Sequence, residues 1–218
     1  MLDWPNIETV LLDMDGTLLD LHFDNYFWLT YVPSVYAEKN NIEKQAAFAD
    51  LHARFESQRG KMQWYCLDYW SEQLDLNIAA LKLDIAHKIA IRPWTEQFLQ
   101  ELKLSNKRVV LLTNAHRDSL DLKMEITKIE HYFDALVSTH DYGYPKEEQA
   151  LWHALQADYP FNPDKTLLVD DTEAVLHSAE KYGIKHLLTL RQPDSQNPAR
   201  MNLHFQVIEH FDEVLPLG

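Results

Sequence analysis

The sequence predicts an α/β fold, with a doubly wound parallel sheet and an inserted segment that is entirely helical. Short β-rich apolar runs alternate with helix-length amphipathic segments, the pattern of a parallel sheet covered by helices on both faces. One long stretch breaks this rhythm, because it is rich in helix formers and aromatic residues and has no strand pattern. Three of the apolar runs end in polar residues, at the edge where such sheets bind their ligands.

Five apolar runs are predicted strands, at residues 7–13, 108–114, 135–140, 166–171 and 185–190. The amphipathic segments between them predict helices at residues 94–104, 117–130, 146–157 and 172–182. Residues 21–90 are predicted to be the inserted helical cap, with helices near 25–39, 42–59, 62–74 and 78–89. The sheet domain is then expected to comprise residues 1–20 and 91–218.

The composition indicates a globular protein whose partners are small molecules. The chain has 218 residues, of which 46% are hydrophobic, and its 34 acidic and 20 basic residues give a formal net charge of −14. Such a charge repels nucleic acids and anionic membranes, so neither is an expected partner. No apolar stretch approaches the roughly 20 residues needed to cross a bilayer.

The first residues and the cysteine content favour the cytoplasm. The start MLDWPNIETV carries an acid where an export signal would carry positive charge, so no export signal is expected. A single cysteine, Cys66, permits neither an internal disulfide nor a cluster of several thiolates. We therefore expect a cytoplasmic protein. The sequence does not indicate its oligomeric state.

The motif Asp13-Met14-Asp15-Gly16-Thr17 follows the first predicted strand. Two carboxylates placed two residues apart at a strand end allow one to act as a nucleophile while the other transfers protons. A solvated acidic turn is the alternative, and for this short motif alone it is the commoner one.

Three further elements lie at the same predicted edge of the sheet. Thr113 and Asn114 end the second strand with a hydroxyl and backbone N–H groups that suit a phosphoryl oxygen, although they also suit a helix cap. Lys146 follows a rigid Gly-Tyr-Pro approach, where the alternative is an exposed lysine. Asp170 and Asp171 end the fourth strand, and Asp171 also fits a helix cap.

With these four elements in this order, the chain resembles the phosphatases of the haloacid dehalogenase superfamily. Their Rossmann-like core carries four such motifs in the same order along the chain. The resemblance implies that Asp13 is the nucleophile and Asp15 the general acid and base. It also implies that Thr113 and Lys146 hold phosphate, and Asn114, next to Thr113 in the second motif, is a further candidate for phosphate binding. Mg²⁺ is implied on the Asp13 carboxylate, the Asp15 carbonyl and Asp171.

The sequence departs from the superfamily pattern at the last motif. Many members have a glycine before the metal-binding aspartate and an acid four residues after it, where this chain has Asp170 and Val175. We expect Asp170 to supply the second carboxylate, directly or through water. Carboxylates that converge within 4 Å repel by roughly 4 kcal/mol per pair at an effective dielectric of 20, so they need a cation. Hard oxygen ligands favour Mg²⁺.

Nearly half of the aromatic residues lie in the predicted cap. Most such side chains form the core of a helical unit. The candidates for stacking on a flat leaving group are Trp64 and Tyr65, followed by Phe27 and Trp28. Long strings in the cap and core, such as FDNYFW, WYCLDYWSEQL, TNAH and GYPKE, are similar to the bacterial GMP/IMP nucleotidases. This similarity implies hydrolysis of purine 5′-mononucleotides.

Other activities remain open at this point. A sugar-phosphate phosphatase or a phosphoglucomutase would use the same fold and motifs. A protein without catalytic activity is disfavoured, because neither the nucleophile nor the lysine is missing. A zinc enzyme is also disfavoured, because the 11 histidines form no H-E-x-x-H motif and there is no cysteine pair.

Overall fold

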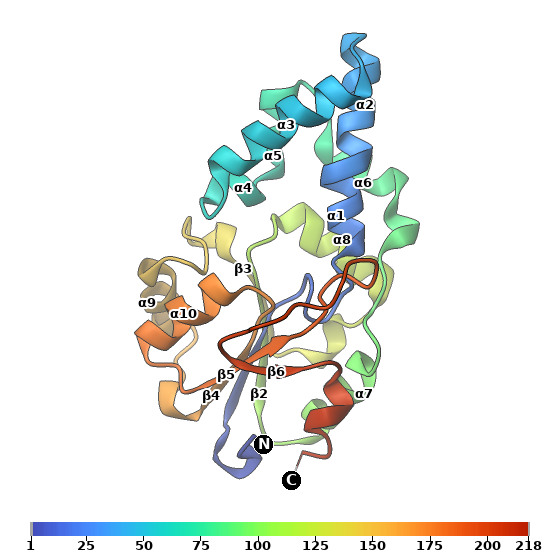
Figure 1. The fold of residues 1–218 in the computed structure, drawn as a ribbon. Helices are drawn as coiled ribbons and strands as arrows, with labels where there is room; N and C mark the ends of the chain where they lie inside the picture. The colour runs from blue at the N-terminus through green and yellow to red at the C-terminus, as the bar shows by residue number, and fades with distance from the viewer. Residues whose placement is uncertain (1, 218) are drawn as a thin grey trace.

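The computed structural model, which describes residues 2–217, contains one six-stranded parallel sheet in the order β3-β2-β1-β4-β5-β6. Figure 1 shows the sheet in the lower part of the molecule, with the two chain ends close together below it. The strands are β1 (Thr9–Leu12), β2 (Arg108–Thr113), β3 (Ala135–Ser138), β4 (Thr166–Val169), β5 (His186–Leu190) and β6 (Gln206–Ile208). The predicted α/β class and doubly wound parallel sheet are confirmed.

Alternate residues of β1 pack against helices on opposite faces of the sheet, as the period of a strand requires. Val10 and Leu12 share a buried cluster with α7 and α8, whereas Leu11 belongs to a second cluster with α9 and α10. The helices are α7 (Thr95–Leu104), α8 (Arg117–Thr127), α9 (Gln149–Asp158) and α10 (Glu173–Tyr182). Because both faces are covered, the strands are apolar throughout, which made them recognisable in the sequence.

The register of the sheet brings the polar strand ends together. Leu12 of β1 pairs with Leu111 of β2 on one side and with Val169 of β4 on the other. Asp13 therefore follows at the same level as Leu112 and Asp170, and its N–H donates to the carbonyl of Val169 at 3.0 Å. The chain leaves β1 toward β2 on one side, and β4 lies on the other side, so this is the switch point of the sheet.

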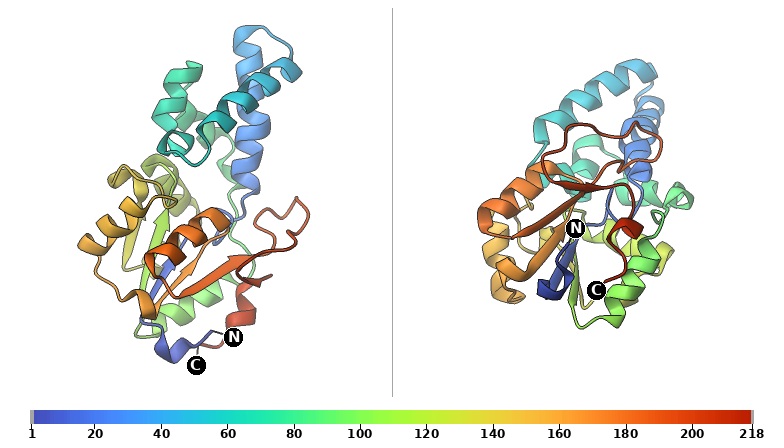
Figure 2. Two further views of the ribbon diagram at one scale, coloured as in Figure 1. Left: turned by 60° about the vertical axis from the view of Figure 1, so that its left-hand side comes forward. Right: turned by 60° about the horizontal axis from the view of Figure 1, so that its bottom comes forward.

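The helices between residues 21 and 90, here called the helical segment, gather beyond the carboxyl ends of the strands in every view (Figures 1 and 2). They are α1 (His22–Tyr26), a π-helical turn (Phe27–Tyr31), α2 (Val32–Asn40), α3 (Lys44–Gln58), α4 (Met62–Tyr65), α5 (Leu67–Leu74) and α6 (Ile78–Asp84). This placement suits the predicted cap, while its boundaries at residues 21 and 90 stay a prediction.

Two local expectations are wrong. The helix expected at residues 62–74 is divided, because the extended backbone of Cys66 ends α4 and its sulfur accepts the Tyr69 N–H to begin α5. Strand β6 was missed, because its three residues form an edge strand inside a turn-rich region. Among residues 2–217, no helix has the length and apolar character to cross a membrane.

Candidate active site

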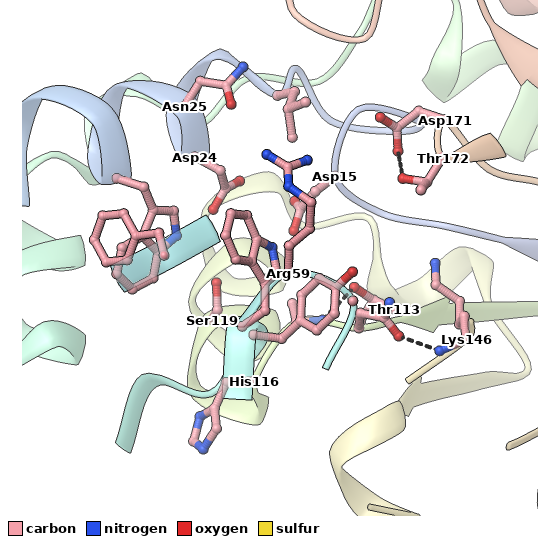
Figure 3. A pocket seen from close by; sticks show the side chains of 18 of the residues that line it. Asp15, Asp24, Asn25, Arg59, Thr113, His116, Ser119, Lys146, Asp171 and Thr172 are labelled. Atoms are coloured by element: carbon pink, nitrogen blue, oxygen red, sulfur yellow. Dashed lines mark hydrogen bonds between the residues drawn. The ribbon is translucent and has the colours of Figure 1, made fainter. Parts of the chain in front are cut away.

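A cavity of about 580 Å³ lies between the carboxyl ends of the strands and the helical segment. Figure 3 shows Asp15, Lys146 and Asp171 around it, with Arg59 entering from the helical segment. All of the predicted catalytic, phosphate-binding and metal-binding side chains line this cavity: Asp13, Asp15, Thr113, Asn114, Lys146, Asp170 and Asp171. Positions that span more than 150 residues of sequence thus meet in one place.

Lys146 is buried and lies between two carboxylates. Its Nζ is 2.6 Å from Oδ1 of Asp13 and 2.6 Å from Oδ2 of Asp170, and it also donates to the carbonyl of Leu112 at 3.2 Å. Burial opposes its charge, but the two aspartates outweigh burial and raise the pKa of Lys146. It is therefore a permanent cation at the end of β1, in contrast to the exposed lysine of the alternative interpretation.

The side chain of Asn114 positions the Lys146 loop. Its Oδ1 accepts hydrogen bonds from the Lys146 N–H at 2.9 Å and from the Thr139 hydroxyl at 3.0 Å, and its Nδ2 donates to Glu147 at 3.0 Å. The second oxygen of Glu147 accepts a 2.7 Å hydrogen bond from the hydroxyl of Tyr65. Asn114 and Glu147 thereby connect the sheet to the helical segment, and direct contact of Asn114 with phosphate stays a prediction.

Asp13, Asp170 and Asp171 each offer one carboxylate oxygen within 4.8 Å of the others. The Oδ2 atom of Asp13 is buried and has no hydrogen-bond partner in the described residues. Burial raises the pKa of Asp13 to about 6, and burial together with Asp13 and Asp170 raises the pKa of Asp171 well above its usual range. An all-oxygen group of crowded carboxylates fits a divalent cation such as Mg²⁺.

Gly16 makes room for Asp171. A Cβ atom on Gly16 would lie 2.7 Å from Cγ of Asp171, and the backbone at Gly16 has a φ of +83°. Both the contact and the dihedral angle require glycine. The glycine of the first motif thus shapes the carboxylate group as well as the turn.

Asp15 belongs to a chain of charges that the sequence did not reveal, with two buried lysines and two partly buried aspartates. Lys123 of α8 contacts Oδ1 of Asp15 and Oδ2 of Asp24, both at 2.6 Å, and Lys82 of α6 contacts Oδ1 of Asp24 at 2.8 Å. Burial and the nearby Asp24 raise the pKa of Asp15 to about 6, while Lys123 opposes them. Burial also raises the pKa of Asp24, but Lys123 and Lys82 outweigh it and lower this pKa to about 2.

A family model of haloacid dehalogenase-like hydrolases matches residues 7–183 of the chain. This range includes all of the predicted site residues and most of the sheet. The chain belongs to the haloacid dehalogenase-like hydrolase family. The predicted superfamily and the prediction of a hydrolase are confirmed.

Among known proteins, this hydrolase is similar to the GMP/IMP nucleotidase YrfG of Escherichia coli K12, with 45% identity over 192 residues that cover 88% of the chain and 86% of the relative. It is 24% identical to the pyrophosphatase PpaX of Bacillus cereus strain Q1, over 82% of the chain and 81% of that protein. A solved phosphatase of this superfamily from Thermococcus onnurineus has the same fold, with a TM-score of 0.79 and 20% identity over 95% of this chain and 96% of that one.

Three of the four aromatic residues predicted to contact substrate in this haloacid dehalogenase-like hydrolase line the cavity: Trp28, Trp64 and Tyr65. The prediction for Phe27 is wrong. Its side chain is fully buried against Phe23 and beneath the Lys82 ammonium, and it is not among the cavity-lining residues in the described part of the chain.

Several cavity residues of the helical segment were not predicted as site residues, and Arg59, a basic residue of the kind that is usually solvated, is the clearest example. Its guanidinium lies 5.0 Å from the centre of the Trp64 ring and is hydrogen-bonded to Glu56 through Nε at 2.8 Å. Both Arg59 and Glu56 line the cavity. The helical segment therefore contributes a charged pair as well as aromatic rings.

Proposed function

We propose that this chain is a Mg²⁺-dependent phosphomonoesterase that hydrolyses the purine 5′-mononucleotides GMP and IMP through an aspartyl-phosphate on Asp13. The observation that carries the proposal is the environment of Asp13, whose Oδ1 is bound to Lys146 while its buried Oδ2 has no partner in residues 2–217. The substrate class is supported by the 45% identity to the nucleotidase YrfG across both the sheet and the helical segment.

In the proposed reaction, a carboxylate oxygen of Asp13 attacks the phosphorus atom and the P–O bond to the nucleoside breaks. Asp15 gives its proton to the departing 5′ oxygen, then takes a proton from the water that attacks the aspartyl-phosphate. This second attack releases phosphate and restores Asp13. Lys146 compensates the negative charges of Asp13 and of the incoming phosphate.

Asp13, Asp170 and Asp171 would hold Mg²⁺ together with the carbonyl of Asp15. Their crowded oxygens and the unpartnered atom of Asp13 fit such an ion. When bound, Mg²⁺ supplies positive charge that allows an anionic nucleophile and an anionic phosphate to approach each other. Asp170 also accepts hydrogen bonds from Lys146 and from the Thr172 N–H, so it orients the lysine beside the proposed ion.

The replacement Asp13→Asn tests the nucleophile. The amide has nearly the same size as the carboxylate but is a far weaker nucleophile, so we expect turnover to be lost while the fold is retained. Phosphate release from a panel of esters, with and without Mg²⁺, measures both points. Wild-type activity that needs no Mg²⁺, or turnover by the variant above a few per cent, would contradict the mechanism, and a requirement for a hexose bisphosphate would indicate a mutase.

The helical segment is proposed to act as the cap that selects the base. The ring of Trp64 carries the Arg59 guanidinium on one side, and Arg59 is paired with Glu56. A guanidinium donates hydrogen bonds and a carboxylate accepts them. A 6-oxopurine presents the complementary pair, an acceptor at O6 and a donor at N1, whereas adenine presents the reverse. This arrangement favours GMP and IMP over AMP.

Two replacements separate stacking from hydrogen bonding. Trp64→Ala should lower kcat/KM for GMP and IMP by roughly 5- to 150-fold, the value of a stacked base, with much less effect on p-nitrophenyl phosphate. Glu56→Gln should reduce the preference for GMP over AMP. Phe48→Ala, in an exposed aromatic residue of the same segment, is the matched control. Equal losses on nucleotides and on the small ester would show that the segment does not select the base.

A further inference from the structure

Three potential metal ligands from distant parts of the sequence meet at the edge of the cavity. They are Cys66 between α4 and α5, His116 just before α8, and His140 in the turn after β3. The Cys66 sulfur and one nitrogen of each histidine all lie within 4.8 Å of one another. Cys66 belongs to the helical segment and the two histidines belong to the sheet domain, so the group spans both.

Two of these side chains have few competing partners, whereas Nδ1 of His116 accepts a 3.3 Å hydrogen bond from the Asp118 N–H. The Cys66 sulfur accepts one long hydrogen bond, 3.4 Å from the Tyr69 N–H. The Nε2 atom of His140 is buried and has no hydrogen-bond partner in the part of the chain that the structure describes.

We propose that Cys66, His116 and His140 bind a zinc ion that ties the helical segment to the sheet domain. One thiolate and two imidazoles form a ligand set typical of zinc, whose tetrahedral shell is completed by a fourth ligand. Asp68 offers that ligand or holds a water in its place, since its Oδ2 is 3.6 Å from Nε2 of His116. Binding displaces the thiol proton of Cys66 to solvent.

This site is chemically distinct from the carboxylate group at Asp13. Sulfur and nitrogen ligands select zinc over Mg²⁺, whereas the carboxylates favour Mg²⁺. His116 lines the cavity, but in Figure 3 it lies apart from Asp15 and Asp171 and points away from them. A metal here leaves the reacting groups untouched and restrains the movement of the helical segment. Because lid opening limits turnover in many enzymes, zinc should lower kcat.

Cobalt(II) titration tests the site directly. Co²⁺ replaces Zn²⁺ in such sites and gives a thiolate-to-cobalt absorption band, and Cys66 is the single cysteine of the sequence. In the presence of excess Mg²⁺, the wild-type protein should show this band, and added Zn²⁺ should remove it. The band should be absent from Cys66→Ser, and His140→Asn should weaken Co²⁺ binding by roughly 10-fold or more.

His177→Ala is the matched control, because His177, Glu180 and His204 form another possible metal group, exposed and without a thiolate. This variant should keep the band. Absence of a thiolate band in the wild-type protein would overturn the site, as would a band that His140→Asn leaves unchanged.

Turnover measurements test whether zinc links the helical segment to the sheet domain. Zn²⁺ added at saturating Mg²⁺ should lower the kcat of the wild-type protein for p-nitrophenyl phosphate, and Cys66→Ser should relieve this inhibition. Equal inhibition of both proteins would mean that zinc acts at the carboxylates around Asp13, and it would overturn the proposal that zinc links the helical segment to the sheet domain. The Mg²⁺-dependent activity of Cys66→Ser in the absence of zinc reports that the variant is folded.

Discussion

Replacing Lys123 with methionine should change the pH dependence of hydrolysis. Lys123 is buried and lies 2.6 Å from Asp15. An opposite charge at this range lowers a carboxyl pKa by roughly 1 to 3, so its removal should raise the pKa of Asp15 from about 6 by that amount. The free enzyme needs Asp15 protonated to act as an acid, so the alkaline limb of kcat/KM reports this pKa.

The magnitude follows from the protonated fraction of Asp15. With a pKa of about 6, kcat/KM of the wild-type enzyme should fall by roughly 90-fold between pH 7 and pH 9. If the pKa rises to about 8 in Lys123→Met, the fall over the same range should be about 10-fold. The assay is the pH profile of kcat/KM with p-nitrophenyl phosphate and constant free Mg²⁺. The absolute rate should also be lower, because Asp15 loses the group that holds it in place.

Lys82→Met is the matched control. Lys82 is equally buried and contacts Asp24, not Asp15, at 2.8 Å. Each replacement breaks a buried ion pair, which should cost roughly 3 to 5 kcal/mol in the free energy of unfolding, so both variants are measured at low temperature. Lys123→Met should move the alkaline limb much further than Lys82→Met, because Lys82 contacts Asp24 and not Asp15. An unmoved limb in this variant, or an equal shift in Lys82→Met, would refute the assignment of Lys123 as the partner that sets the acidity of Asp15.

Two further predictions concern the carboxylates. Gly16→Ala should raise the Mg²⁺ concentration needed for half-maximal activity by roughly 10-fold or more, because its Cβ would lie 2.7 Å from Cγ of Asp171; an unchanged Mg²⁺ dependence would mean that the carboxylate moves freely. Burial raises the pKa of Asp13 and Asp15 from 3.8 to about 6, so the unfolded chain releases these protons first as pH rises. The metal-free protein should therefore lose stability between about pH 4 and pH 6, and Mg²⁺ should raise its melting temperature more at pH 7 than at pH 5, which calorimetry would show.

The sequence predicted the parts of the fold that depend on local pattern. The strands are buried on both faces and form short apolar runs, and the chemical residues follow them directly, so both could be recognised together. The edge strand β6 lacks such a run. The division at Cys66 depends on one hydrogen bond from the Tyr69 N–H to a side chain, and helical periodicity carries no sign of it.

The site residues at the ends of strands could be predicted from the sequence, whereas the site residues on helices could not. Asp13 and Asp170 lie at neighbouring strand ends, and strand order alone brings them together. Lys123 and Lys82 occupy single positions on amphipathic helices, where a lysine is usually exposed. The prediction that Phe27 contacts substrate was wrong for a related reason. An aromatic residue in a helical unit can face either the cavity or the core, and only the packing of the folded chain decides between them.

The structure also changes the expected division between chemistry and selectivity. The sequence places all four chemical motifs outside residues 21–90, which suggests that the helical segment acts only on the leaving group. In the structure, Asp24 and Lys82 of that segment continue the ion-pair chain that ends at Asp15. Any movement that withdraws Asp24 would leave Lys123 with Asp15 as its single anionic partner and would change the acidity of Asp15. The position of the helical segment and the proton transfer in the sheet domain are therefore coupled through one buried lysine.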